Sequence, residues 1–162
     1  ERCQTQNRPR LIGEFSMKLK LNKKPLLRIS RAATRDTKVV YLAVANRKFR
    51  YHLDKSPIVY IGTSKIGIRR VAHSAASKAE EIIKEYNCKY LDFYTISASG
   101  YPGVAIWEKL ERALVIRFRE LYGDVPKYNQ SYRKARWRDE KRYFKESVLD
   151  EMIYHFKEIN ER

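Results

Sequence analysis

A glutamate lies on the apolar face of a predicted helix that ends at Tyr122. Apolar residues recur at helical spacing along this segment, and Glu111 falls in the middle of their stripe, between Trp107 and Phe118. Glu108 lies one turn earlier, at the edge of the stripe. A carboxylate against a protein core either meets a cation or shifts its pKa until it is neutral. Three interpretations follow: a salt bridge to an arginine, a metal ligand, or a catalytic carboxylate.

A second predicted helix, from Ile66 to Tyr86, carries side chains suited to holding phosphate or moving protons. Arg69 and His73 are four residues apart and share one polar face. At about 100° per residue, we expect Arg69 at the boundary of the apolar face, where it can reach a cleft beside the sheet. Arg70 is expected on the opposite, solvated side. Taken alone, His73 is better explained as a surface or structural residue.

Hydrophobic periodicity predicts the elements that hold these residues. Alternating apolar and polar residues predict a half-buried strand over 15–21. Continuous β-branched runs predict buried strands over 37–45 and 58–62, joined by a polar stretch, and another strand is predicted over 90–97. In the central part of the chain the order is strand, strand, helix, strand, helix, which indicates a small α/β sandwich.

Helix ends and the final helix are predicted from capping residues and spacing. Gly123 is expected to cap the helix that carries Glu111. From about Arg138 onward a third, amphipathic helix is predicted. Its expected buried residues are Val148, Leu149, Met152, Ile153, Phe156 and Ile159.

The composition indicates one basic domain and predicts a polyanionic partner. The chain has 162 residues, 35 Lys and Arg against 19 Asp and Glu, a net charge of +16, and 43% hydrophobic residues. This is enough apolar material for one packed core. The longest apolar run, 39–45, is too short to cross a bilayer, and no basic amphipathic helix is predicted to bind a membrane. We therefore expect an intracellular, cytoplasmic protein that binds nucleic acid rather than membranes.

Cysteine and histidine content argues against a protein-built zinc site. The two cysteines are far apart, at positions 3 and 88, and the three histidines do not form an HExxH motif. Any bound metal is therefore expected to be a hard cation held by carboxylate oxygen.

Five sequence features follow one another in a definite order. They are Val39-Val40-Tyr41, Tyr60-Ile61-Gly62, the helix with Arg69 and His73, the run 111–115 that begins with Glu111, and Pro126-Lys127-Tyr128-Asn129. This ordered set resembles the GIY-YIG nuclease superfamily, which includes intron homing endonucleases, some restriction enzymes and the excision-repair incision subunit. The resemblance covers roughly residues 37 to 130.

The resemblance implies a fold and a domain organisation. The fold class is α/β (α+β), with a small central three-stranded antiparallel sheet flanked by helices. Residues 1–36 form a basic N-terminal extension, 37–130 the nuclease core, and 131–162 a basic segment followed by the amphipathic helix.

The resemblance also implies hydrolysis of phosphodiester bonds with one Mg²⁺ or Mn²⁺ ion per active site. Its implied catalytic residues are Tyr41, Tyr60, Arg69, His73, Glu111 and Asn129. Glu111 would hold the ion, Arg69 the scissile phosphate, and Asn129 would fix the geometry of the site. Either tyrosine would activate water or relay its proton, oriented or deprotonated by His73. Because the pKa of a phenol is near 10, a nearby cation would have to lower it.

The chain departs from the family pattern in its first motif and in the spacing of the motifs. The first motif lacks the family's glycine, and the connector between Tyr41 and Tyr60 is longer than the family's short hairpin. The stretch between Glu111 and Asn129 is also longer than usual, by about two turns of helix. If the family's spacing after Tyr60 is kept without a gap, the motif arginine is Arg70. If this chain has one deletion relative to the family pattern, it is Arg69. We expect Arg69, because that choice places His73 four residues later and agrees with the helical face.

Basic segments on either side of the core predict a surface for a DNA duplex. The expected nucleic-acid contacts are Lys65, Arg70, Arg133, Lys134, Arg136 and Arg138. Aromatic side chains lie among the later ones, and the basic block over 18–35 offers a second clamp. We expect double-stranded DNA as the partner and a sequence-specific endonuclease of restriction or mobile-element type, with a homodimer as one route to cutting both strands. The alternative is a non-catalytic nucleic-acid-binding module of the same fold.

Overall fold

The computed structural model describes residues 37–98, 103–135 and 140–157, and these form an α+β fold. Three antiparallel strands make one sheet in the order β2-β1-β3. They are β1 (Val39–Arg50), β2 (Lys55–Ser64) and β3 (Leu91–Ser97). Each was predicted. The strand predicted over 15–21 lies outside the described residues.

The first two strands extend further than their apolar runs predicted. β1 continues through residues 46–50, and after an irregularity beyond Val44 the register pairs Phe49 with Ser56 and Arg50 with Lys55. The expected polar connector therefore ends in a short paired hairpin. Its turn is closed by the N–H of Tyr51, which donates to the carbonyl of Asp54 at 2.9 Å. Buried Phe49 explains the extension, because it packs against the ring of Tyr86.

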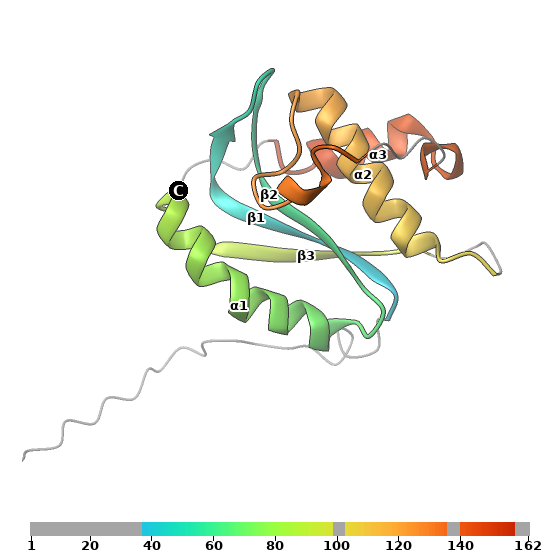
Figure 1. Ribbon diagram of the computed structural model, residues 1–162, viewed down its shortest axis with the longest axis horizontal. Coiled ribbons are helices and arrows are strands. Elements are labelled where there is room, and N and C mark those ends of the chain that lie inside the picture. The colour runs from blue at the N-terminus through green and yellow to red at the C-terminus, as the bar shows by residue number, and fades with distance from the viewer. Residues whose placement is uncertain (1–36, 99–102, 136–139, 158–162) are drawn as a thin grey trace, which may run out of the picture.

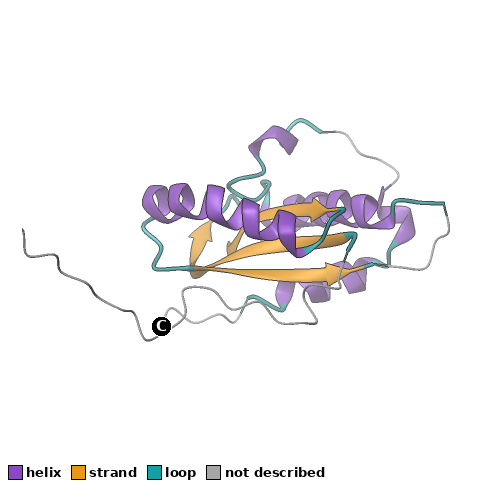
Figure 2. Ribbon diagram, turned by 90° about the horizontal axis from the view of Figure 1, so that it is seen from below, coloured by secondary structure: helices purple, strands orange, loops and turns teal. Residues whose placement is uncertain are grey.

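Helices cover both faces of the sheet. They are α1 (Ile68–Tyr86), α2 (Ile106–Tyr122) and α3 (Glu146–Tyr154), with two short 3₁₀ turns, η1 (Gln130–Tyr132) and η2 (Glu140–Tyr143). Figure 1 shows α1 along one side of the sheet and α2 and α3 on the other, and Figure 2 shows the strands as one layer with helices on both sides. Gly123 ends α2 with φ 78°, so the predicted cap is confirmed.

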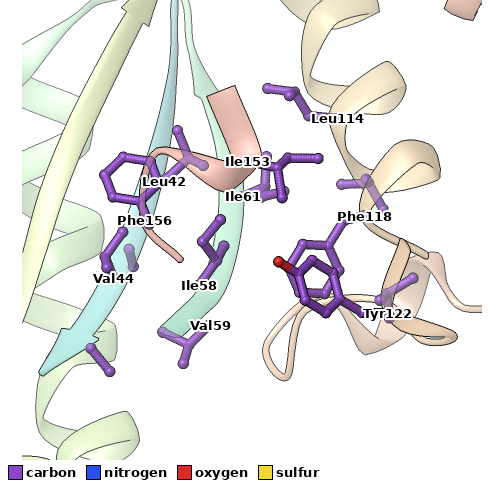
Figure 3. Close-up of a cluster of buried hydrophobic side chains, with 14 of the residues drawn as sticks. Leu42, Val44, Ile58, Val59, Ile61, Leu114, Phe118, Tyr122, Ile153 and Phe156 are labelled. Atoms are coloured by element: carbon purple, nitrogen blue, oxygen red, sulfur yellow. The ribbon is translucent and has the colours of Figure 1, made fainter. Parts of the chain in front are cut away.

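The main core lies between the sheet and the two later helices. Leu42 and Ile61 from the strands face Leu114 and Phe118 of α2, and Ile153 of α3 closes the space (Figure 3). All five side chains are buried. This packing fixes α2 against β2, and α2 carries Glu111.

The third helix is shorter than predicted. The structure has a 3₁₀ turn over 140–143, and α3 begins only at Glu146. Leu149 and Ile153, four residues apart, are buried, whereas Val148 is 39% exposed, so its predicted burial is wrong. The reason is helical geometry, because Val148 lies about 100° from Leu149 around the helix. Ile159 is outside the described residues.

Two further observations concern the described part of the chain. None of its helices has the length and apolar character needed to cross a lipid bilayer. Cys88 is a free, buried thiol.

Candidate active site

Two tyrosines lie side by side on the sheet face that packs against α1. The register pairs Tyr41 with Gly62 and Ala43 with Tyr60, so the two phenol side chains project from one face. Their ring centroids are 5.8 Å apart. A Cβ at Gly62 would lie 2.6 Å from Cε1 of Tyr60 and 2.8 Å from the hydroxyl oxygen of Tyr41. Gly62 is therefore glycine because both rings lie over it.

The hydroxyl of Tyr41 is held by a residue of α1. Tyr41 is buried, and its hydroxyl donates a hydrogen bond of 3.0 Å to Oγ of Ser74. Ser74 is itself only 3% exposed. The proton of the phenol is thus directed at Ser74, and the Tyr41 oxygen accepts from the Tyr60 side chain, which helps to raise the pKa of Tyr60.

Glu111 is buried, as the sequence predicted, at 6% exposure. Its Oε1 accepts a hydrogen bond of 3.3 Å from the hydroxyl of Tyr132. The adjacent Arg112 pairs with Glu140, at 3.3 Å between Nη1 and Oε1. Burial raises the pKa of Glu111 to about 7, while Tyr132 and Arg112 lower it only in part. Among the described residues, the contact of Glu111 is thus with a phenol and not the salt bridge to an arginine that was one of the three interpretations, and its pKa is near neutral pH.

The pKa of Tyr60 is raised rather than lowered. Burial is the main cause, and Tyr41 and Glu111 add to it. Lys78 of α1 places Nζ 4.8 Å from the centroid of the Tyr60 ring, a distance at which an ammonium is attracted to an aromatic face. The expectation that a nearby cation lowers the pKa of this phenol is not met. Tyr60 is protonated at neutral pH and acts as a hydrogen-bond donor.

The side chain of Asn129 binds the backbone of β2. Its Oδ1 accepts from the N–H of Ile61 at 2.8 Å, and its Nδ2 donates to the carbonyl of Ile61 at 2.7 Å. Tyr128 adds a backbone hydrogen bond of 2.9 Å to the carbonyl of Val59. Asn129 is buried. It therefore fixes the residue between Tyr60 and Gly62 from the edge of β2 that does not pair with β1.

The face of α1 that packs against the sheet favours Arg70 over the predicted Arg69. Ser74 lies toward the tyrosines, and at about 100° per residue it is about 40° from Arg70 but about 140° from Arg69. Both arginines are exposed. Arg70, and not Arg69, therefore lies on the side of α1 that meets Tyr41, one turn before Ser74.

His73 is exposed and lies next to the serine that binds Tyr41. The expected contact between His73 and a tyrosine hydroxyl is made by Ser74 instead. Arg70, Ser74 and Lys78 form a row at intervals of four residues along α1, facing the tyrosine pair.

The residues present fit one hard divalent cation held by a single protein carboxylate. The described residues contain no group of three or more His, Cys, Asp or Glu side chains that could enclose a metal ion. Mg²⁺ commonly keeps several waters and uses one or two carboxylates together with substrate phosphate. Glu111 offers such a carboxylate, and its raised pKa reflects a buried charge that a cation would stabilise.

The predicted nucleic-acid contacts have different environments. Lys65, Arg70 and Lys134 are exposed. Arg133 pairs with buried Asp124, with its Nε 3.0 Å from Oδ1, although the arginine remains more than half exposed. Arg136 and Arg138 lie outside the described residues. Arg133 therefore already has a structural partner. Lys65 lies just before α1, and Arg70 lies in its first turn.

Three residues near the site were missed by sequence reasoning. Ser74 and Lys78 follow Arg70 at four-residue intervals, so the spacing could have found them if Arg70 had been chosen. Tyr132 follows Asn129 by three residues, and its N–H donates to the carbonyl of Asn129 at 2.8 Å. A tyrosine in a basic segment carries no signal that predicts contact with Glu111.

Comparison of the chain with protein-family models, with curated proteins and with solved structures gave no match.

Proposed function

We propose that this chain is a metal-dependent DNA endonuclease that hydrolyses phosphodiester bonds. The observation that carries the proposal is that the buried carboxylate Glu111 of α2 lies near enough to the tyrosine pair, Tyr41 of β1 and Tyr60 of β2, to raise the pKa of Tyr60. A carboxylate near two phenols in a basic protein suits a site that binds a phosphate and a divalent cation. The resemblance to GIY-YIG nucleases supports the same function.

In the proposed mechanism, the residues of the chain hold the substrate and orient water. Glu111 would hold the Mg²⁺ or Mn²⁺ ion, which when bound supplies positive charge at the phosphate and the leaving oxygen. Arg70 holds non-bridging oxygens of the scissile phosphate, because a guanidinium offers paired donors. The hydroxyl of Tyr41 donates its hydrogen bond to Ser74, so its oxygen can accept a hydrogen bond from the attacking water. Tyr60 donates to an oxygen of the phosphate or the water.

Exposed cations near the start of α1 extend the proposed phosphate-binding surface. Lys65 and Arg70 provide sequence-independent contacts whose affinity falls with salt. We propose double-stranded DNA as the substrate. One site per chain cuts one strand at a time, so cleavage of both strands requires a homodimer or two successive nicks.

Plasmid cleavage tests the proposal. Supercoiled plasmid is incubated with the full chain in Mg²⁺, in Mn²⁺ and in EDTA, and nicked and linear products are quantified. We expect cleavage with either metal and none in EDTA. Glu111→Gln should abolish cleavage, whereas Glu108→Gln, an exposed glutamate one turn earlier on α2, should retain it.

The alternative function is a nucleic-acid-binding module without catalysis. One observation favours it: the described residues contain no group of three or more His, Cys, Asp or Glu side chains that could hold a metal ion. Binding is measured by gel shift on the same plasmid and on short duplexes. DNA that is bound but stays intact in Mg²⁺ and Mn²⁺ would refute the endonuclease and support the module.

A further inference from the structure

Strand β3 is an edge of the sheet, and no described element covers it. In the part of the chain that the structure describes, β3 pairs only with β1. None of its seven residues is buried, whereas the first eight residues of β1 all are. Proteins normally cover, charge or shorten such an edge, because its free N–H and C=O groups can pair with another strand.

An apolar groove of about 370 Å³ lies beside this edge, between β3 and α3. Its lining residues are Tyr94, Thr95, Ile96, Val148, Glu151, Met152, His155 and Phe156. Tyr94 is 38% and Val148 39% exposed, although both are large and hydrophobic. The described residues that line the groove include no lysine or arginine, and Asp92 lies on the same face of β3 as Tyr94. A basic segment with apolar side chains on one face would fit it.

One segment of this chain has that character. Phe15, Met17, Leu19 and Leu21 alternate with Ser16, Lys18 and Lys20, and from 15 to 35 there are seven Lys and Arg and no acidic residue. This period of two is that of a strand with one apolar face.

The chain is long enough to bring this segment to the edge of β3. β1 begins at Val39, which pairs with Ser97 at the end of β3 and with Ser64 of β2, and the N–H of Lys38 donates to the carbonyl of Lys65, so the preceding chain leaves the sheet at the end where β3 finishes. The fifteen residues over 22–36 span up to about 50 Å when extended. β3 itself is only about 23 Å long.

We propose that the segment over 15–21 adds to the free edge of β3 as a fourth strand, with its apolar side chains in the groove between β3 and α3. Part of the basic N-terminal extension then belongs to the sheet. The proposal does not depend on nuclease activity.

Backbone amide hydrogen exchange on the full chain without DNA tests the proposal. We expect alternate amides over 15–21, and the amides of β3 that point away from β1, to exchange at least about tenfold more slowly than unfolded peptide amides. Protection should be independent of protein concentration. Met17→Lys places a charge on the apolar face and should abolish this protection in both segments, whereas Ser16→Lys, on the opposite face, should leave it intact. The β3 amides that donate to β1 should stay protected in every variant.

A second pair of variants tests the groove. Val148→Lys should abolish the protection over 15–21, and Ser147→Lys, its exposed neighbour on α3, should not. Circular dichroism checks that all four variants fold.

Three results would overturn the proposal. They are fast exchange over 15–21 in the unmodified chain, protection that rises with protein concentration, and protection that requires added DNA. The second would instead indicate pairing with a second copy, and the third would indicate ordering on the nucleic acid.

Discussion

The hydroxyl of Tyr41 on β1 and Oγ of Ser74 on α1 are 3.0 Å apart and form a buried hydrogen bond. This bond joins the face of the sheet that carries both tyrosines to the helix that carries the exposed cations. It also fixes the direction in which the O–H group of Tyr41 points. If the proposed function is right, the serine acts through Tyr41 and is a positioning residue.

Ser74→Ala should therefore lower cleavage more than DNA binding. Loss of the bond leaves the buried Tyr41 hydroxyl without its acceptor, which costs about 1–3 kcal/mol of stability and frees the phenol to rotate. We expect kcat to fall about tenfold or more with a nearly unchanged KM. Ser77→Ala is the matched control, because exposed Ser77 only donates to the backbone carbonyl of Ser74. Equal losses in both variants would argue against a specific role for Ser74.

Arg70→Ala and Arg69→Ala distinguish the two candidate arginines. Arg70 lies one turn before Ser74 on the side of α1 that meets Tyr41, and Arg69 points away. We expect Arg70→Ala to reduce cleavage by about 100-fold or more, since it removes paired donors from the phosphate. Arg69→Ala should change cleavage only slightly. Steady-state cleavage of a defined duplex measures both, and an inactive Arg69→Ala beside an active Arg70→Ala would restore the sequence-based choice.

The sequence predicted the fold well because the signals of the fold are local and periodic. The continuous run 39–45 predicted the central strand, and the glycine at 123 predicted the end of α2. Glu111 was found for the same reason, because a charged residue interrupts an apolar stripe. In each case the property that determines the structure is visible within about one or two helical turns of chain.

The predictions that failed depend on how α1 is rotated about its own axis and on contacts between residues far apart in the sequence. The apolar face of α1 is rich in alanine, so its predicted centre was too broad to distinguish Arg69 from Arg70. In the structure, Val71, Ser74 and Ile82 define that face, and a buried serine is among them because Tyr41 binds it. The contact of Tyr132 with Glu111 spans 21 residues and joins a 3₁₀ turn to a helix, and no periodicity reports such a pair.

Asn129→Ala should destabilise the fold as well as the site. The amide of Asn129 makes two buried hydrogen bonds to Ile61, and removal leaves an N–H and a carbonyl of β2 without these partners. We expect a loss of about 2–4 kcal/mol in the free energy of unfolding. Urea denaturation measures it, with Gln130→Ala as the control. The side-chain amide of Gln130 is exposed and donates to the carbonyl of Lys127.

Asn129→Asp gives a sharper test of the same contact. Aspartate keeps the acceptor for the N–H of Ile61 but sets a second carboxylate oxygen against the carbonyl of Ile61. This variant should be at least as unstable as the alanine variant at neutral pH. A stability equal to that of the unmodified chain would contradict a structural role for the Asn129 amide.

Gly62→Ala should separate the two tyrosines. A methyl group at this position would lie 2.6 Å from Cε1 of Tyr60 and 2.8 Å from the Tyr41 oxygen, so at least one ring must move. We expect a loss of about 1–3 kcal/mol in stability together with a strong loss of cleavage. Thermal unfolding and plasmid nicking measure the two effects. Normal cleavage in this variant would exclude a catalytic role for the tyrosine pair as it stands.

Stability should fall with rising pH because of Glu111. Its pKa is about 7 in the folded protein against an ordinary value of 4.5, and burial is the main cause. A raised folded-state pKa contributes stability that is present below pH 4.5 and is lost as the pH rises through 7. Between pH 5 and pH 8 this amounts to about 2 kcal/mol.

Glu111→Gln removes this ionisation while keeping an acceptor for the hydroxyl of Tyr132. In urea denaturation, the unmodified chain should lose about 2 kcal/mol more than the variant between the two pH values. All other titrating groups are common to both proteins, so the difference isolates Glu111. Added Mg²⁺ should then stabilise the unmodified chain at pH 8 and leave Glu111→Gln unchanged, and EDTA should reverse the effect. An equal response of both proteins to pH and to Mg²⁺ would show that Glu111 neither ionises near neutral pH nor holds the ion.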